Sequence, residues 1–253
     1  MTCELVTIPC LDDNYAFLVH NSATGETALV DVPDAAPIQA ALTARGWTLT
    51  DIILTHHHWD HIDGLPALSH NARVIGGKAD AHRLPPLDLA VTEGCALTIC
   101  GEPAQVFDVS GHTVGHIAIY MPQSGLAFTA DSLMAMGCGR LFEGTPAQMW
   151  DSMLKLRDLP PDTLICSGHE YTASNARFAA TLEADNPRVS SRVKAIEKAR
   201  AKGAPTVPST LAEEIATNPF LRADDASLKL AINMPDADSV QVFTEIRSRK
   251  DRF

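Results

Sequence analysis

Residues 55–61, THHHWDH, carry four histidines and an aspartate directly after the apolar residues 52–54. β-branched and large apolar side chains are typical of a buried strand, so the histidines should begin where that strand ends. In an extended chain, alternate side chains point to the same side. His56 and His58 can therefore converge on one point, while His57 should face away. Imidazole nitrogens that converge in this way are common metal ligands.

Further carboxylates and histidines also follow short apolar stretches. Asp60 and His61 come as the chain turns after the first stretch, and they can reach a second point near the first. Three more candidates end apolar stretches: His112 after residues 105–109, Asp131 after residues 127–130, and His169 after residues 164–168. Open α/β architectures place their chemistry at the C-terminal ends of strands. The set predicts a site for two metal ions on a rigid framework.

These motifs resemble those of the metallo-β-lactamase superfamily. The matching pieces are the T-H-x-H-x-D-H run, G-H-T at 111–113, A-D at 130–131 and G-H-E at 168–170. The resemblance implies an α+β fold, a four-layer αββα sandwich with a two-metal site at one edge, and a C-terminal helical domain. Within the superfamily, the chain is most similar to the glyoxalase II (hydroxyacylglutathione hydrolase) family. That similarity rests on residues 11–15, 138–144, 168–172, 218–222 and 249–253.

The resemblance implies a role for each candidate ligand. By motif, His56, His58 and His112 would hold one metal ion, Asp60, His61 and His169 the other, and Asp131 would bridge them. We expect two divalent ions per chain, zinc ahead of iron or manganese, although histidine and aspartate suit all three. Two ions about 3.5–4 Å apart can share one water and bring its pKa near neutral, which gives a nucleophile. Asp60 and Asp131 are the catalytic candidates, and Asp60 could orient that nucleophile.

The leaving group narrows the reaction. An amine must be protonated before it leaves, whereas a thiolate, whose conjugate thiol has a pKa of about 8.5, leaves unaided. The resemblance implies a thioester substrate, S-(2-hydroxyacyl)glutathione. Its hydrolysis would give glutathione and a 2-hydroxy acid, for example D-lactate from S-D-lactoylglutathione in methylglyoxal detoxification.

Other functions stay open at this point. The same fold could support a lactonase, a phosphodiesterase acting on RNA, or a persulfide dioxygenase with a single iron. The net charge of −11 argues against a nuclease, which would need a basic surface. A metal-binding module without turnover would require the loss of a ligand, and the sequence contains the full set.

A basic C-terminal segment could bind an anionic substrate. The net charge of −11 repels anions at long range, yet residues 247–253 (RSRKDRF) contain four cations. Basic residues at a helix end also interact favourably with the helix dipole, so a purely structural role is open. The resemblance instead implies glutathione contacts at Arg140, Tyr171, Arg247 and Lys250. Phe142 stands where some family members have tyrosine, so one hydrogen bond to the peptide should be lost.

Composition and cysteine usage indicate a cytoplasmic protein. The chain has no apolar stretch approaching the ~20 residues that cross a bilayer. Its first residues, MTCE, lack the basic segment and apolar core of a secretory signal. Six cysteines occur without a C-x-x-C pair, which is typical of free thiols in a reducing compartment. We expect a cytoplasmic monomer that binds a small-molecule glutathione thioester and neither nucleic acid nor a membrane.

The order of predicted elements divides the chain near residue 172. The first part is dominated by strands, with hairpins at 15–32 and 117–129 and helices at 37–45 and 150–157. A capping box at residues 145–148 should open the second of these helices. Helical spacing then predicts helices at 173–184, 189–202, 210–217 and 240–249. We expect a dinuclear metal domain at 1–172 and a helical substrate-binding domain at 173–253.

Three polar residues near the motifs have less definite roles. His57 should be structural or contact a ligand indirectly. His116, at the start of a strand, should make a structural hydrogen bond or one that supports a ligand, and should not bind a metal itself. Asp31 follows an apolar strand, and it could equally support the ligands or serve a turn.

Overall fold

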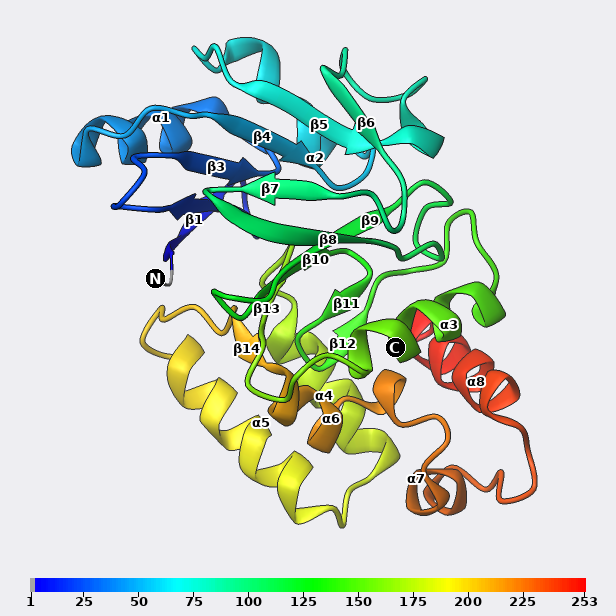
Figure 1. The fold of residues 1–253 in the computed structure, drawn as a ribbon. Helices are drawn as coiled ribbons and strands as arrows, with labels where there is room; N and C mark the ends of the chain where they lie inside the picture. The colour runs from blue at the N-terminus through cyan, green and yellow to red at the C-terminus, as the bar shows by residue number, and fades with distance from the viewer. Residues whose placement is uncertain (1–2) are drawn as a thin grey trace.

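The computed structural model describes residues 3–253, so the first two residues of the segment searched for a secretory signal lie outside it. Two six-stranded sheets pack face to face, and helices cover the outer face of each sheet (Figure 1). The α+β class and the four-layer αββα arrangement predicted from the sequence are confirmed.

The first sheet comes from the N-terminal part of the chain. Its strands, in spatial order, are β1 (Glu4–Cys10), β2 (Asn14–His20), β3 (Thr27–Val30), β4 (Asp51–Leu54), β5 (Arg73–Gly77) and β6 (Leu89–Val91). β2 and β3 form the predicted hairpin, and β3 to β6 run parallel. α1 (Ala35–Arg45) connects β3 to β4. The helix begins two residues before the predicted start, directly after its N-cap Asp34. Gly46 caps its C-terminal end, where a φ of 67° favours glycine.

The second sheet follows in the sequence and supplies the other half of the sandwich. Its strands, in spatial order, are β14 (Ser209–Thr210), β13 (Leu164–Ser167), β10 (Leu126–Ala130), β9 (Ile117–Met121), β8 (Glu102–Asp108) and β7 (Leu97–Ile99). β9 and β10 form the second predicted hairpin, and β10 runs parallel to β13. Ala130 pairs with Ser167, so the residues after these two strands emerge side by side.

Apolar side chains fill the spaces between the layers. Between the sheets, the rings of Phe17 and Phe128 lie 5.8 Å apart within one buried cluster. Outside the first sheet, Ile38 and Leu42 of α1 pack in a second cluster. Because both sheets are covered on both faces, the loops at their strand ends are attached to a rigid framework.

Most of the helices lie after β10 in the sequence, before, between and beyond the last two strands of the second sheet. They are α3 (Pro146–Arg157), α4 (Thr172–Leu182), α5 (Pro187–Arg200), α6 (Leu211–Thr217), α7 (Ala226–Ala231) and α8 (Ser239–Asp251). α3 starts at Pro146 and not at residue 150, because the predicted capping box of Thr145 and Gln148 is its true N-terminus. α7 and β14 were not predicted, since each is too short for a periodic pattern. Within residues 3–253, no helix has the length and apolar character needed to span a membrane.

Several short elements complete the fold. They are α2 (Trp59–Ile62), the β11 (Leu133–Met134) and β12 (Gly137–Cys138) pair, and the 3-10 turns Leu65–Ala67, Lys78–Asp80 and Pro219–Leu221. The C-terminal helices share one apolar cluster with the second sheet, in which Tyr120 of β9 and Ile165 of β13 join Phe178 and Phe243. Packing is thus continuous across residue 172, and the division into two domains there stays a prediction.

Candidate metal centre

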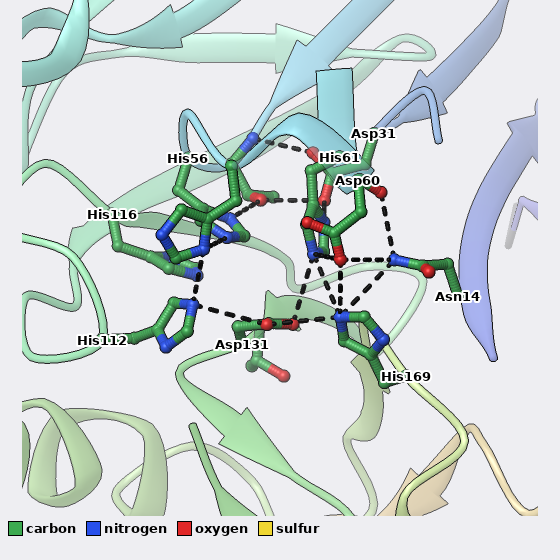
Figure 2. A network of polar contacts seen from close by, with 12 residues as sticks. Asn14, Asp31, His56, Asp60, His61, His112, His116, Asp131 and His169 are labelled. Atoms are coloured by element: carbon green, nitrogen blue, oxygen red, sulfur yellow. Dashed lines mark hydrogen bonds and ion pairs between the residues drawn. The ribbon is translucent and has the colours of Figure 1, made fainter. Parts of the chain in front are cut away.

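The side chains predicted as metal ligands come from segments that follow strands. His56 and His58 follow β4, Asp60 and His61 lie on α2, His112 lies between β8 and β9, Asp131 follows β10, and His169 follows β13. The structure brings all of them together, and Figure 2 shows Asp131 between His112 and His169. Their binding of metal stays a prediction, which the distances between donor atoms allow us to assess.

The first group consists of three imidazole nitrogens. Nδ1 of His58 lies 3.2 Å from Nε2 of His56 and 2.9 Å from Nε2 of His112. His56 and His58 converge because they are alternate residues in an extended segment, as predicted. Nitrogen ligands about 2.1 Å from a tetrahedral ion lie about 3.4 Å apart, so this spacing fits a shared cation.

The second group contains two imidazoles and a carboxylate. Nε2 of His61 and Nε2 of His169 are 3.3 Å apart. Oδ2 of Asp60 lies 3.4 Å from the His169 nitrogen and 3.9 Å from the His61 nitrogen. These donors form a second set of atoms that can hold one cation.

Asp131 lies between the two groups. Its Oδ2 is 3.4 Å from Nε2 of His112 and 3.3 Å from Nε2 of His169, and its Oδ1 is 3.5 Å from Nε2 of His61. The residue is 5% exposed, and Oδ1 is a buried oxygen without a hydrogen-bond partner within the described residues. A buried carboxylate with an unsatisfied oxygen fits a bridge between two cations.

Hydrogen bonds fix which nitrogen carries the proton in two of the three first-group imidazoles. Nδ1 of His112 donates to the carbonyl oxygen of Arg140 at 2.7 Å, which leaves Nε2 as the free acceptor. The hydroxyl of Thr55 donates to Asp31 at 2.8 Å, so Nδ1 of His56 must donate to the Thr55 oxygen, at 3.0 Å. Both Nε2 atoms are therefore directed at the centre as lone pairs.

Asp31 supports the site from a strained backbone position. Its φ of 58° is in the left-handed region, which aspartate tolerates better than most residues. Its carboxylate accepts from Nδ1 of His61 at 2.8 Å and from the backbone N–H of Thr55 at 2.9 Å. Through Thr55 it also supports His56, so one buried carboxylate orients a ligand in each group.

Two supporting residues were missed from the sequence. Asp13 accepts from Nδ1 of His169 at 3.0 Å, which leaves Nε2 of that histidine free. The Asn14 amide donates to the backbone oxygen and to Oδ2 of Asp60, both at 3.0 Å (Figure 2). Both residues lie in the LDDNY segment on which the family resemblance partly rests, so that segment was the available signal.

Burial determines the protonation of the first group. It lowers the pKa of His56 well below the ordinary value and the pKa of His58 to about 4, and it also lowers the pKa of His112. All three imidazoles are neutral at pH 7. They can therefore offer lone pairs to a cation without first losing a proton.

Neighbouring carboxylates reverse this effect in the second group. Burial opposes the charged form of His61, but the carboxylates of Asp131 and Asp31 outweigh it and raise the pKa of His61 well above the usual value. The pKa of His169 is raised against burial in the same way, chiefly by Asp131. Although burial disfavours its charge, His169 and His61 hold the pKa of Asp131 well below its usual range. Metal binding at this group would therefore release protons.

A cavity of about 500 Å³ opens onto the candidate ligands. Its walls include every residue predicted to contact glutathione: Arg140, Phe142, Tyr171, Arg247 and Lys250. The ring of Tyr171 stacks on His169 with a centroid distance of 4.6 Å, and Phe142 meets His58 and His112 edge to face. The cavity thus joins the candidate ligands to a cationic wall, although contact with a substrate stays a prediction.

One acidic residue, Asp251, organises the two arginines of that wall. Its Oδ1 is 2.9 Å from Nη2 of Arg247 and 3.3 Å from Nε of Arg140. Arg247 also donates to the backbone oxygen of Cys138 at 2.9 Å. The sequence analysis counted the C-terminal cations but missed Asp251, whose spacing of four residues from Arg247 on a helix was the available signal.

Lys250 is held differently, between aromatic rings. Its Nζ lies 5.4 Å from the ring centre of Phe178 and 5.1 Å from that of Phe253, and it contacts the Ser174 hydroxyl at 3.2 Å. Burial, with repulsion from Arg247 and Arg177, lowers the pKa of Lys250 to about 8. The ammonium group stays mostly charged at neutral pH and is partly desolvated, which strengthens its attraction for a carboxylate.

The two further histidines of the motifs lie beside the ligands. Nδ1 of His57 is 2.9 Å from Oδ2 of Asp80, away from the donors of both groups. His116 stacks on His56 with a centroid distance of 4.6 Å, and its Nδ1 donates to the Ile117 oxygen at 3.1 Å. The hydrogen bond of His116 is thus the structural one of the two predicted kinds, and its ring supports His56 by lying almost parallel to it.

Family models match almost the whole chain. The metallo-beta-lactamase superfamily model matches residues 12–94 and 101–169, which contain every candidate metal ligand. The model of the hydroxyacylglutathione hydrolase C-terminus matches residues 170–253, which contain Tyr171, Arg247 and Lys250. The two matches meet between residues 169 and 170.

Individual proteins agree with these models. A hydroxyacylglutathione hydrolase from Jannaschia sp. (strain CCS1) is 66% identical over 252 residues, which cover 99% of this chain and 98% of the relative. The solved BLEG-1 B3 metallo-beta-lactamase has a TM-score of 0.67 at 22% identity, covering 86% of this chain and 99% of its own. The structure of TTHA1623 in a di-iron-bound form has a TM-score of 0.58 at 25% identity, with coverages of 86% and 99%.

Proposed function

This chain belongs to the hydroxyacylglutathione hydrolase family of the metallo-β-lactamase superfamily, and we propose that the centre described above carries out its thioester hydrolysis. The enzyme is a hydroxyacylglutathione hydrolase. The substrate we propose is S-D-lactoylglutathione, which would be cleaved to glutathione and D-lactate. One observation carries the assignment to this site: two groups of donor atoms, joined by Asp131, lie at one end of a cavity whose wall is cationic.

The donor set fits two divalent ions. His56, His58 and His112 would hold one ion, Asp60, His61 and His169 the other, and Asp131 would contact both. When bound, such ions would supply an activated water at neutral pH and polarise the thioester carbonyl. We propose zinc as the resident metal. Iron and manganese are alternatives because the ligand types suit them too, and the TTHA1623 structure is in a di-iron-bound form.

The protein's own residues would orient the reactants. Asn14 holds Asp60 by donating to Oδ2, so Oδ1 of Asp60 can accept a hydrogen bond from the attacking water. Arg140, Arg247 and Lys250 would attract the carboxylates of the glutathione moiety, against the repulsion of the chain's net charge of −11. The glutathione thiolate would leave without a general acid, because it is a weak base whose conjugate thiol has a pKa of about 8.5.

Lactonase and persulfide dioxygenase chemistry are less well supported. Relatives that are 56–66% identical over 99–100% of the chain are named hydroxyacylglutathione hydrolases, and the C-terminal family model covers the part that supplies Lys250. We further propose that the protein acts as a cytoplasmic monomer. Its substrate would be a small molecule, and neither nucleic acid nor a membrane would take part.

The direct test is hydrolysis of S-D-lactoylglutathione by the purified protein, with metal content measured on the same sample. We expect rapid turnover and about two metal ions per chain. The control is the same preparation after chelation, which should lose activity and regain it when metal is returned. A fully loaded protein that fails to cleave this thioester would contradict the proposed substrate.

Replacing Lys250 with alanine should weaken binding of the glutathione moiety. We expect KM for S-D-lactoylglutathione to rise about tenfold, the equivalent of one partly buried charge-assisted contact, with kcat nearly unchanged. KM for a small neutral thioester should stay the same. Arg252→Ala is the matched control, since Arg252 is an exposed cation near the end of the same helix. Equal effects of Lys250→Ala on both substrates would refute a glutathione contact.

A further inference from the structure

The loop of residues 139–144, which carries Arg140 and Phe142, is attached on one side to the His112 segment. Nδ1 of His112 donates to the Arg140 oxygen at 2.7 Å, and the backbone N–H of Phe142 donates to the His112 oxygen at 3.2 Å. The N–H of Gly144 donates to the Gly111 oxygen at 3.0 Å. These bonds join residues 140, 142 and 144 of the loop to residues 111 and 112, through the backbone and the His112 ring.

The side chain of Glu143 adds further contacts to the loop. Its Oε2 accepts from the backbone N–H of Val114 at 2.8 Å and from Nη2 of Arg83 at 3.1 Å, and its Oε1 accepts from Nη1 of Arg83. Oε1 also lies 3.6 Å from Nε2 of His57. The hydrogen bond from Arg83 lowers the pKa of Glu143 to about 2, so this carboxylate is ionised over the whole working range. The two-pronged arginine contact is directional and resists rotation of the loop.

Arg83 is in turn held by a buried carboxylate. Asp80 is 1% exposed and accepts from Nε of Arg83 at 3.1 Å and from Nδ1 of His57 at 2.9 Å. Gly115 permits this placement, because a Cβ atom there would lie 2.1 Å from the Asp80 carboxyl carbon. Four side chains, those of His57, Asp80, Arg83 and Glu143, therefore form one continuous network, which we call the loop clasp.

The loop clasp connects the loop to the backbone of the first ligand group. His57 stands between His56 and His58, and His112 holds the inner edge of the same loop. The loop is thus placed relative to all three first-group imidazoles from two directions. None of the clasp side chains lines the cavity or contacts a candidate donor atom within the described residues, so their effect on the site must pass through the loop.

We propose that Glu143 and Arg83 are positioning residues, which set the place of Arg140 and Phe142 in the cavity and so determine affinity for the glutathione part of the substrate. The inference rests on the proposed function. It also gives a role to His57, which the metal centre does not use. Replacing Glu143 or Arg83 should therefore alter KM and leave the reacting groups intact.

The test uses Glu143→Gln, Arg83→Gln and the double variant in the full-length, metal-loaded enzyme. Each single change should raise KM for S-D-lactoylglutathione about three- to tenfold with kcat within about twofold. KM of the double variant should not exceed that of the single variant with the higher KM, because both residues act through one contact. The kcat/KM for a small neutral thioester should stay unchanged. Glu93→Gln is the matched control, because Glu93 pairs with Lys155 at an exposed site.

Unchanged KM in both single variants would overturn the inference, and lower thermal stability beside it would show that the network only stabilises the fold. A multiplicative effect in the double variant would overturn the inference too. Equilibrium binding of S-methylglutathione, which is not cleaved, separates this inference from the proposed function. If the wild-type protein binds it and the variants bind it equally well, the clasp has no positioning role, whatever thioester the enzyme cleaves.

Discussion

Asp131→Ala should abolish most hydrolysis and reduce the metal content to one ion per chain or fewer. Asp131 approaches a histidine of each group, through Oδ2 to His112 and His169 and through Oδ1 to His61. Two divalent ions bring four positive charges, which the two carboxylates of Asp60 and Asp131 partly neutralise. Removing the shared carboxylate leaves one anionic ligand and increases repulsion between the ions. We expect activity to fall by more than about 100-fold, the upper range for residues that only orient a ligand.

Asp131→Asn provides the matched comparison, because it keeps the size of the side chain and removes its charge. Both variants should lose metal, and the alanine variant should lose more. Metal analysis and turnover must be measured on the same samples, together with thermal unfolding after chelation, to show that the fold survives. Normal loading with normal turnover in the alanine variant would contradict the bridging role.

Sequence periodicity predicted which side chains would converge, because their positions follow from local geometry. Alternation in an extended segment is enough to bring His56 and His58 together. The parallel pairing of β10 and β13 then places Asp131 beside the segment that ends in His169, which the apolar stretches before these residues had indicated. Each of these inferences needs only the type of the element and the position of its end.

Supporting residues were harder to predict because their contacts join distant parts of the chain. Asp80 and Glu143 both meet His57, from 23 and 86 positions away in the sequence. A carboxylate after an apolar stretch can cap a turn or orient a ligand, and Asp31 orients His61. Nothing in the local sequence distinguishes these roles, since the deciding partner is brought near only by the packing of the sheets.

The basic C-terminal segment shows what helical spacing adds to composition. Arg247 and Lys250 are three residues apart on α8, so they share the face that lines the cavity. Arg249 points elsewhere, where it pairs with Glu245 at 2.8 Å. Counting four cations therefore overstated the charge available to a substrate, and the helix register reduces it to two.

Asp31→Asn should lower the affinity for both metal ions, even though Asp31 contacts neither candidate group's donor atoms. Its carboxylate accepts hydrogen bonds from His61 directly and from His56 by way of the Thr55 hydroxyl. An amide nitrogen in place of Oδ2 would face two donors, the Thr55 hydroxyl and Nδ1 of His61, and could accept from neither. Loss of such a partner typically weakens metal binding by about 10- to 100-fold, and we expect that range here.

Asparagine is the appropriate replacement because it also tolerates the left-handed backbone, with its φ of 58°, that Asp31 adopts. Competition with a chromophoric chelator would give the affinity of each ion. Asp34→Asn is the matched control, since Asp34 caps α1 and asparagine caps a helix equally well. Weakening of only one ion would limit the role of Asp31 to one of the two groups, whereas unchanged affinity for both would show that the imidazoles hold their orientation without it. Lower affinity for both ions would instead mean that one buried carboxylate orients ligands in both groups of the centre.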